Sequence, residues 1–402
     1  MMELLSPAGG LDSLIAAVQT GADAVYMGFG AFNARRSAKN FTDEEFASAV
    51  AYCHLRGVRV FLTLNTLLTD RELEQAAESL RKASDMGVDA VLVQDWGLLT
   101  LAREIVPDVP LHASTQMSLF TLGGANEAAA LGLERVVLAR ELARDEIREI
   151  CAGCPAQIEV FAHGALCMCY SGQCEMSAVV GERSGNRGAC AQPCRYQYAL
   201  MEEKRPGEYF PVFEDEKGTY IMNSRDMCMI GHLDDIMDAG IDCIKIEGRA
   251  KSEYYAAIVT GAYRHVLDEV AAGETPDPVW LDEVEHVSHR HYSTGFYYGQ
   301  PGQYYDNSRY IRDWQVVAVV ESCDANGMAT LSLRNKFRAG DTVEVVGPDC
   351  KPFSMVVPEM RDAEGFTLLE PRNPRMIFTM QLPRSVPAMS FVRHAVDLSA
   401  RD

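Results

Sequence analysis

The sequence predicts a parallel (β/α)8 barrel with a cysteine-rich loop insertion, followed by a small antiparallel β-barrel. Residues 1–250 repeat one theme, in which a short apolar strand is followed by a polar turn and an amphipathic helix. Near-continuous apolar strands that alternate with helices indicate parallel strands covered by helices. Roughly eight such units in about 250 residues match the barrel. From residue 314 the alternation of apolar and polar residues is that of antiparallel strands.

The elements of the first domain follow from apolar runs and from glycines that end helices. Strands are expected at 3–6, 24–27, 58–65, 90–94, 111–114, 135–139, 158–162, 220–222 and 243–246. Helices are expected at 11–20, 43–56, 71–86, 123–131, 145–151 and 232–239. The short strand at 220–222 makes the count nine, so one strand is expected to lie outside the barrel. An open doubly wound sheet is disfavoured, because no Gly-x-Gly-x-x-Gly follows the first strand.

The pattern changes after residue 252, which predicts a second part of the chain. Helices at 254–272 and 281–289 lead into a turn-rich aromatic segment at 293–302. Strands are then expected at 316–321, 328–333, 341–346 and 365–369, with glycines in the turns between them. We therefore expect a barrel over 1–265, a helical and aromatic linker over 266–311, and a small β-barrel domain over 312–402.

Length and composition are those of an ordinary globular protein. The chain has 402 residues, of which 48% are hydrophobic and 23% charged, and this length favours two domains. No apolar run is long enough to cross a bilayer, and MMELLSPAGG lacks the basic and apolar regions of a signal peptide. Twelve cysteines without a secretion signal favour the reducing cytoplasm. A cytoplasmic protein without membrane contact is expected.

The charge distribution bears on possible partners. The net charge of −20 repels nucleic acid on average. The local field can differ, because cationic residues gather in or near the cysteine-rich segment: Arg183, Arg187, Arg195, Arg225, Arg249 and Lys251. An equally good interpretation is that these cationic residues form ordinary ion pairs on the surface. An RNA partner would have to dock on a local basic patch or through a partner protein.

The cysteine-rich segment Glu159–Cys194 is the strongest chemical signal. It holds five of the twelve cysteines, which are Cys167, Cys169, Cys174, Cys190 and Cys194. The first of them follows the apolar run 158–162 closely, so the cysteines sit on a loop that a rigid strand supports. We therefore expect this loop to lie over the carboxyl-terminal mouth of the barrel, where strand-to-helix loops emerge.

Three interpretations of these cysteines remain open. Zinc sites usually bring ligands in pairs separated by two to four residues. Here the spacings are C-x6-C, fifteen residues, and C-x3-C, so only the pair Cys190 and Cys194 suits zinc. Irregular spacing on long loops favours an iron–sulfur cluster, and Cys228 is a further candidate ligand. The third interpretation is that the thiols are simply buried as small hydrophobes.

The same segment resembles the signature of the collagenase-like peptidase family U32. The matching residues are Glu159, Phe161, Gly164, Ala165, Leu166, Cys167, Gly172, Cys174 and Ser177. Residues 186–195, 223–228 and 245–249 are also similar to the family, and the resemblance runs from residue 4 to about residue 300. It implies a 4Fe–4S cluster held by Cys167, Cys174, Cys190 and Cys228, with Cys194 as the alternative fourth ligand.

Within the family, the length and architecture resemble the tRNA hydroxylation proteins. The resemblance implies hydroxylation of the tRNA wobble uridine to 5-hydroxyuridine, by a route linked to the dicarboxylate prephenate. Polar residues that follow the strands would form the site, and we assign catalysis to Asn65, His112 and Glu247. The arginines assigned to a carboxylate or phosphate are Arg36, Arg187, Arg225 and Arg249.

Two other functions stay open. The family name implies a collagenase-like peptidase, but the chain has no His-Glu-x-x-His motif and no recognisable Ser-His-Asp order. A zinc-stabilised scaffold without catalysis is the second alternative. Asparagines and aspartates that follow strands also commonly cap helices, so no single one of them establishes a site.

Overall fold

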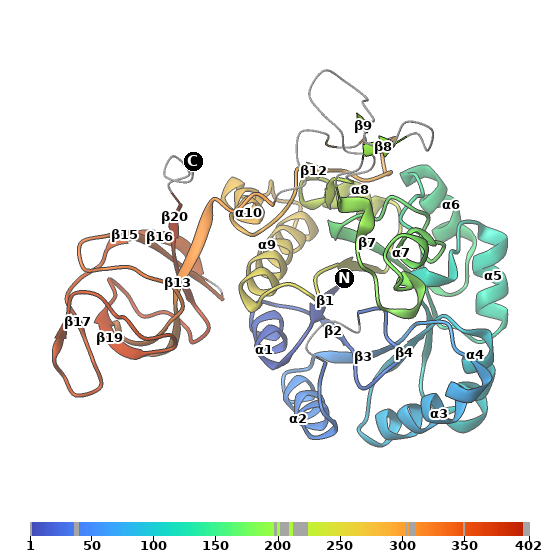
Figure 1. The fold of residues 1–402 in the computed structure, drawn as a ribbon, viewed down its shortest axis with the longest axis horizontal. Helices are drawn as coiled ribbons and strands as arrows, with labels where there is room; N and C mark the ends of the chain where they lie inside the picture. Colours follow the sequence, from blue (N-terminus) through green and yellow to red (C-terminus); the bar gives the residue numbers. More distant parts are fainter. Residues whose placement is uncertain are drawn as a thin grey trace.

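The computed structural model describes residues 2–35, 40–196, 199–201, 209–211, 224–302, 304, 310–348 and 350–396. Figure 1 shows a helix-covered barrel, blue to yellow, beside a smaller β domain, orange to red. The fold class predicted for the barrel is confirmed. Two predicted features, Arg36 and the strand at 220–222, lie outside the described residues.

Eight parallel strands form the barrel. They are β1 (Glu3–Ala8), β2 (Ala24–Met27), β3 (Arg59–Leu64), β4 (Ala90–Val93), β5 (Leu111–Ala113), β6 (Arg135–Val137), β7 (Gln157–Ala165) and β11 (Cys243–Ile246). Neighbours in the chain pair side by side, and β11 pairs with both β1 and β7, which closes the barrel. The strands are buried almost throughout because helices cover their outer face.

The helices that cover the barrel begin at side-chain caps in several places. They are α1 (Leu11–Gln19), α2 (Asp43–His54), α3 (Asp70–Asp85), α4 (Trp96–Ile105), α5 (Leu122–Ala130), α6 (Arg144–Gly153), α8 (Leu233–Asp238) and α9 (Glu253–Ala271). Helix α4 was not predicted, although Asp95 caps it by accepting a hydrogen bond from the Leu98 amide at 3.0 Å. Within the described residues, no helix is long and apolar enough to span a bilayer.

Short strands extend the barrel wall above β7. Strand β10 (Asp226–Cys228) pairs antiparallel with the end of β7, and β12 (Tyr292–Ser293) pairs parallel with β10. Cys228 lies opposite His163 in this register. Strands β8 (Ala199–Met201) and β9 (Tyr209–Pro211) form a separate antiparallel pair. The end of β7 is therefore a wall of the mouth, and β10 is part of that wall.

The second domain is an antiparallel sheet around a core of its own. Its strands are β13 (Trp314–Cys323), β14 (Met328–Leu333), β15 (Thr342–Gly347), β16 (Cys350–Val356), β17 (Met360–Arg361), β18 (Thr367–Leu368), β19 (Ile377–Gln381) and β20 (Phe391–Ala395). Strands β16, β17, β19 and β20 were not predicted. Strand β20 lies between β15 and β13 and begins with three buried residues in succession, so it lacks the alternation of a half-exposed strand. The helix expected at 281–289 is shorter, α10 (Pro278–Glu283) followed by η5 (Val284–His286).

A buried ion-pair network fastens this domain to the barrel helices. Arg393 of β20 is fully buried and donates to both carboxylate oxygens of Glu283 in α10, at 2.6 and 2.8 Å. It also donates to Glu344 of β15 at 2.8 Å and to the Tyr254 hydroxyl of α9 at 2.9 Å. One guanidinium therefore ties two elements of each domain together.

Replacing Arg393 with methionine should lower the stability of the domain junction strongly. The change leaves the buried Glu283 carboxylate without its guanidinium partner, which costs about 3–5 kcal/mol for buried pairs. Arg361→Met is the matched control, because its side chain is 62% exposed and pairs with Glu359 on the surface. Differential scanning calorimetry of both variants checks this, and equal melting temperatures would contradict the network's role.

Candidate functional site at the mouth of the barrel

The cysteine loop folds across the carboxyl-terminal mouth of the barrel, as the sequence predicted. After β7 it forms α7 (Met176–Val179), η2 (Gly185–Arg187) and η3 (Pro193–Arg195). Gly172 has a positive φ of 78°, and a Cβ there would lie 2.1 Å from the Gln116 carbonyl oxygen. Glycine is required at this close approach, which seats the loop directly on η1 (Thr115–Met117).

Two adjoining cavities lie beneath and beside this loop. The inner cavity, of about 130 Å³, lies between the strand ends and the cysteines. The second, which we call the basic chamber, has a volume of about 360 Å³ and extends toward the linker. Both cavities are lined by Ala34, Arg35, Glu247 and the cysteines Cys167, Cys190 and Cys194. These six residues therefore form the wall between the two spaces.

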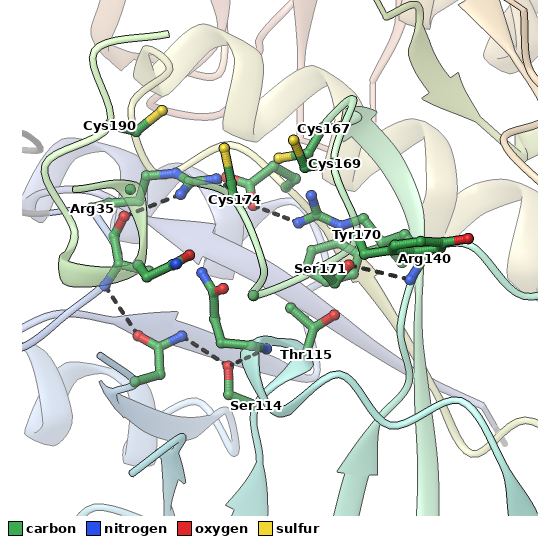
Figure 2. Close-up of a pocket in the computed structure, with 18 of the residues that line it drawn as sticks. Arg35, Ser114, Thr115, Arg140, Cys167, Cys169, Tyr170, Ser171, Cys174 and Cys190 are labelled. Atoms are coloured by element: carbon green, nitrogen blue, oxygen red, sulfur yellow. Dashed lines mark hydrogen bonds and ion pairs between the residues drawn. The ribbon is translucent and has the colours of Figure 1, made fainter. Parts of the chain in front are cut away.

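All five cysteines of the loop line the inner cavity. In Figure 2 the sulfurs of Cys167, Cys169, Cys174 and Cys190 lie around the same space, although they come from separate parts of the loop. Burial, together with its neighbour Cys174, raises the pKa of Cys169 to about 12, and burial also raises the pKa of Cys194. A metal centre would stabilise the thiolates that this crowding disfavours, so the donor set fits a cysteine-ligated centre.

Cys228 does not join the other cysteines. It belongs to β10, where it lies opposite His163, and it lines neither cavity. Burial raises its pKa to about 11, and the Tyr263 hydroxyl is its side-chain partner. The structure instead brings Cys194 to Cys167, Cys174 and Cys190. Pairing of β10 with the β7 extension turns Cys228 away, and that pairing is not visible in cysteine spacing.

Two of the three residues assigned to catalysis line the inner cavity. Asn65, after β3, accepts a hydrogen bond from the Ala34 amide at 3.1 Å and donates to the Ser114 hydroxyl at 3.0 Å. Glu247, after β11, is bridged by Arg35 at 3.2 Å and by Arg140 at 3.1 Å. Burial opposes ionisation of Glu247, but these guanidiniums outweigh it and lower its pKa. Glu247 is therefore a carboxylate near neutral pH.

His112, the third residue assigned to catalysis, does not reach the cavity. It points into the barrel interior, where its ring packs edge-on against Phe61 at 5.0 Å. Burial, with Arg135 nearby, lowers its pKa to about 3, so the imidazole is neutral at physiological pH. His112 is the middle residue of β5, so its side chain faces the barrel interior, and the sequence did not show this direction.

The arginines assigned to anion binding are scattered. Arg249 lines the inner cavity and is held by Thr63 at 2.9 Å and Asn40 at 2.7 Å. Arg187 points away and anchors the loop to α3, donating to Glu72 at 2.6 Å. Arg225 lines neither cavity, and Arg36 is not among the described residues.

Sequence reasoning missed several cations that do line the basic chamber. They are Arg35, Arg195, Lys251, Arg290 and Arg312, and of these Lys251, Arg290 and Arg312 lie close to the ring of Tyr310. Arg195 and Lys251 had been noted near the cysteines, but only as part of a general basic tendency. Arg290 and Arg312 lie far from the cysteines in sequence, in a stretch that mixes arginine and aromatic residues, and Arg35 carries no comparable local signal.

The fold and the site together define a class of protein. Its members have a parallel barrel with a cysteine-bearing loop across the mouth, followed by an antiparallel domain. The model of peptidase family U32 matches residues 9–307, and that of the family's C-terminal domain matches residues 312–393. The chain therefore belongs to peptidase family U32, as the resemblance implied.

Three relatives illustrate the range of the family. The tRNA hydroxylation protein P of Escherichia coli is 33% identical over 95% of this chain and 93% of its own length. The 23S rRNA 5-hydroxycytidine C2501 synthase of the same organism is 42% identical over 67% of this chain and 40% of its own length. A protein named collagenase from Porphyromonas gingivalis is 32% identical over 89% of this chain and 90% of its own length.

Gly172→Ala should displace the cysteine loop. The added Cβ meets main chain and not a flexible side chain, and the positive φ adds strain of about 1–3 kcal/mol. We expect a lower melting temperature and faster labelling of the loop cysteines by a thiol reagent than in the wild-type chain. Gly231→Ala is the control, since nothing lies within 4 Å of its Cβ position. Unchanged labelling of Gly172→Ala would show that the contact does not position the cysteines.

Proposed function

We propose that this chain is an iron–sulfur-dependent RNA hydroxylase that forms 5-hydroxyuridine at the tRNA wobble position. The observation that carries the proposal is the inner cavity at the barrel mouth. Cysteine thiols line one side of this cavity, and amide and hydroxyl side chains line the other. The family relatives named for tRNA hydroxylation and for rRNA hydroxycytidine synthesis support it. The route linked to prephenate, and a cytoplasmic location, are parts of the same proposal.

The proposed ligands of the 4Fe–4S cluster are Cys167, Cys174, Cys190 and Cys194. This set replaces Cys228, for the reason that Cys194 lines the cavity with the other three while Cys228 does not. Such a cluster supplies one-electron transfer when bound. Zinc is the alternative occupant of the same sulfur donors.

The residues of the inner cavity suit recognition of a nucleobase. An enzyme that modifies a base takes it out of the stack and reads its polar edge in a pocket. Asn65, Ser114 and Gln116 offer hydrogen-bonding groups at the floor of the cavity. Tyr170 lines the same cavity and is 64% exposed, with its ring edge-on to Phe120 at 5.4 Å. An exposed ring of this kind gives a base a face on which to stack.

Electrostatics would limit how the RNA docks. The net charge of −20 disfavours long contact with a polyanion. Docking would then depend on a local basic surface or on a partner protein. We expect only weak salt dependence of any direct tRNA binding, because few phosphate contacts release few counterions and salt also screens the overall repulsion.

The peptidase activity implied by the family name is the second candidate, and the relative named collagenase favours it. A cysteine nucleophile needs an adjacent base. Among the described residues that line the two cavities there is no histidine. His163, at the end of β7, is buried against the hydroxyls of Tyr263 and Tyr292 at 3.3 and 3.4 Å. The geometry therefore favours the hydroxylase.

The cluster proposal predicts brown protein with about four iron atoms per chain after anaerobic purification. Cys194→Ala should lose most of the iron and sulfide, whereas Cys228→Ala should retain them, because only Cys194 lies with the other ligands. Cys323→Ala in the second domain is the control. Iron and sulfide analysis with absorption spectra checks this. A colourless anaerobic protein with one tightly bound zinc would reject the cluster.

The substrate is tested in the host cell. Deletion of the gene should remove most of the 5-hydroxyuridine from bulk tRNA, measured by mass spectrometry in a strain without redundant relatives. Wild type and Cys323→Ala should restore it, and Cys174→Ala should not, because a proposed cluster ligand is lost. An unchanged level of hydroxyuridine after deletion would reject the assignment. Cleavage of gelatin by the pure protein, abolished by one site mutation, would favour the peptidase.

A further inference from the structure

The negative charge of this protein is unevenly divided between its two parts. Residues 312–402 contain 11 lysines and arginines and 12 aspartates and glutamates, so the second domain is close to neutral. Nearly all of the net charge of −20 therefore belongs to residues 1–311. A polyanion that approaches the protein is repelled by the barrel and meets the least repulsion at the second domain.

Two loops at one end of the second sheet gather cations. They are the loop 334–341 between β14 and β15 and the loop 369–376 before β19, and we call them together the basic rim. The loops lie side by side, because the Ala339 amide donates a hydrogen bond to the Leu369 carbonyl at 2.8 Å. Five cationic residues belong to the rim: Arg334, Lys336, Arg338, Arg372 and Arg375.

Most of these charges are free to meet a ligand. Four of the five cations are exposed, which are Lys336, Arg338, Arg372 and Arg375. Among the residues that the structure describes, three of these four have no ion-pair partner, and only Arg338 pairs, with Asp341 at 3.5 Å. Glu370 is the other carboxylate residue on the two loops. The rim therefore carries more positive than negative charge, on a protein that is strongly acidic overall.

Buried side chains anchor the basic rim. Phe337 of the first loop is 3% exposed and packs against Phe378 of β19, with the ring centroids 5.8 Å apart. Pro371 of the second loop is also buried. Each anchor directly precedes an exposed arginine, Arg338 or Arg372. The backbone that carries these cations is thus held in place before a ligand arrives, which reduces the entropy lost on binding.

Arg375 has a backbone conformation that residues with a side chain rarely adopt. Its φ is 58°, in a turn where the Met376 amide donates to the Asn373 carbonyl at 3.0 Å. Glycine would fit this conformation without strain, so the arginine adds its charge at a conformational cost. Strained residues of this kind concentrate at binding and active sites. The conformation therefore supports a ligand-binding role for the Arg375 side chain.

The first loop of the basic rim begins beside the mouth of the barrel. Arg334 pairs with Glu253, the first residue of α9, at 4.0 Å. Helix α9 follows the carboxyl end of β11, so this contact lies at the mouth end of the barrel. The Arg334 amide also donates to the Val317 carbonyl of β13 at 2.7 Å, shortly after Arg312 of the basic chamber. A nucleic-acid strand that leaves the mouth can therefore continue onto the rim.

An exposed aromatic ring lies at the same end of the second sheet. The register of β17 on β19 points the turn at 362–366 toward the start of β19. Phe366 of this turn is 70% exposed. The turn also carries Asp362 and Glu364, so the positive surface ends there. An exposed ring beside a cationic surface is typical of proteins that bind unpaired nucleotides, because bases stack on the ring.

We propose that the basic rim docks the phosphate backbone of the substrate RNA while the target base enters the inner cavity. The inference rests on the proposed function for the identity of that RNA. Separate cations spaced along two loops match the repeated charges of a nucleic-acid backbone. A protein partner would instead need an apolar centre to its interface, and Leu369 is the one exposed large apolar side chain on the two loops.

Direct binding of RNA to the purified full chain tests the proposal. The probe is a fluorescent, unmodified tRNA transcript with uridine at the wobble position, and fluorescence anisotropy measures its affinity over a range of salt concentrations. The triple variant Lys336→Gln, Arg372→Gln and Arg375→Gln should bind at least about tenfold more weakly than wild type. Its salt dependence should be flatter, because fewer phosphate contacts release fewer counterions. The three residues are exposed, so folding stays intact, which the melting temperature checks.

A second triple variant makes the same change of charge on the barrel. Arg71 and Arg81 of α3 and Arg148 of α6 are exposed. Arg71→Gln, Arg81→Gln and Arg148→Gln together should weaken binding by less than about threefold, because charges farther away than a Debye length are screened. An equal loss of affinity in both triple variants would overturn the proposal, as would a wild-type chain that does not bind the transcript at low salt.

This inference and the proposed function can fail separately. Weaker tRNA binding by the rim variant, together with hydroxyuridine that is unchanged by deletion of the gene, would leave the inference standing and reject the proposed function. Hydroxyuridine that depends on the gene, together with a rim variant that binds tRNA like wild type, would reject the inference alone. If that variant also failed to restore hydroxyuridine in the deletion strain, the rim would be assigned to a protein partner instead.

Discussion

The carboxylate of Glu247 is the constraint on which the mouth of the barrel depends. It draws Arg35 from the segment after β2 and Arg140 from the segment after β6 onto the end of β11. Its backbone is fixed as well, since its amide donates to the His163 carbonyl at 2.9 Å and its carbonyl accepts from Tyr255 at 3.0 Å. The cavity wall is therefore built around one ionised side chain, and the cysteine loop closes over it.

A second layer of charge lies deeper in the barrel. Lys245 pairs with Glu159 at 2.8 Å, and Arg135 bridges Glu159 at 3.3 Å and Glu3 at 2.8 Å. Buried ions are costly to desolvate, so each must find partners of matching geometry. Here the neighbouring strands β6, β7 and β11 supply Arg135, Glu159 and Lys245, and β1 supplies Glu3. Burial, with Arg135 of this layer nearby, lowers the pKa of His112 and keeps its imidazole neutral.

The second domain takes part in the site through the linker that leads to it. Tyr310 and Arg312 line the basic chamber just before β13 begins. The Arg393 network holds that domain against α9 and α10, and thereby limits where the linker can run. Tyr310 and Arg312, at the start of the second domain, therefore lie at one edge of the barrel mouth.

The sequence by itself determined the barrel, because alternating apolar strands and capped helices are local patterns that packing then satisfies. It also determined that the cysteine loop, Asn65, Glu247 and Arg249 lie at the mouth, since residues that follow parallel strands share one end of a barrel. Only the tertiary structure decided which side chains meet there. Pairing of β10 with β7 removes Cys228 from the other cysteines, while the fold of the loop places Cys194 with them at the inner cavity. The basic chamber likewise depends on a linker more than a hundred residues beyond the first cysteine folding back beside it. Such contacts arise from long-range packing, and local periodicity carries no information about them.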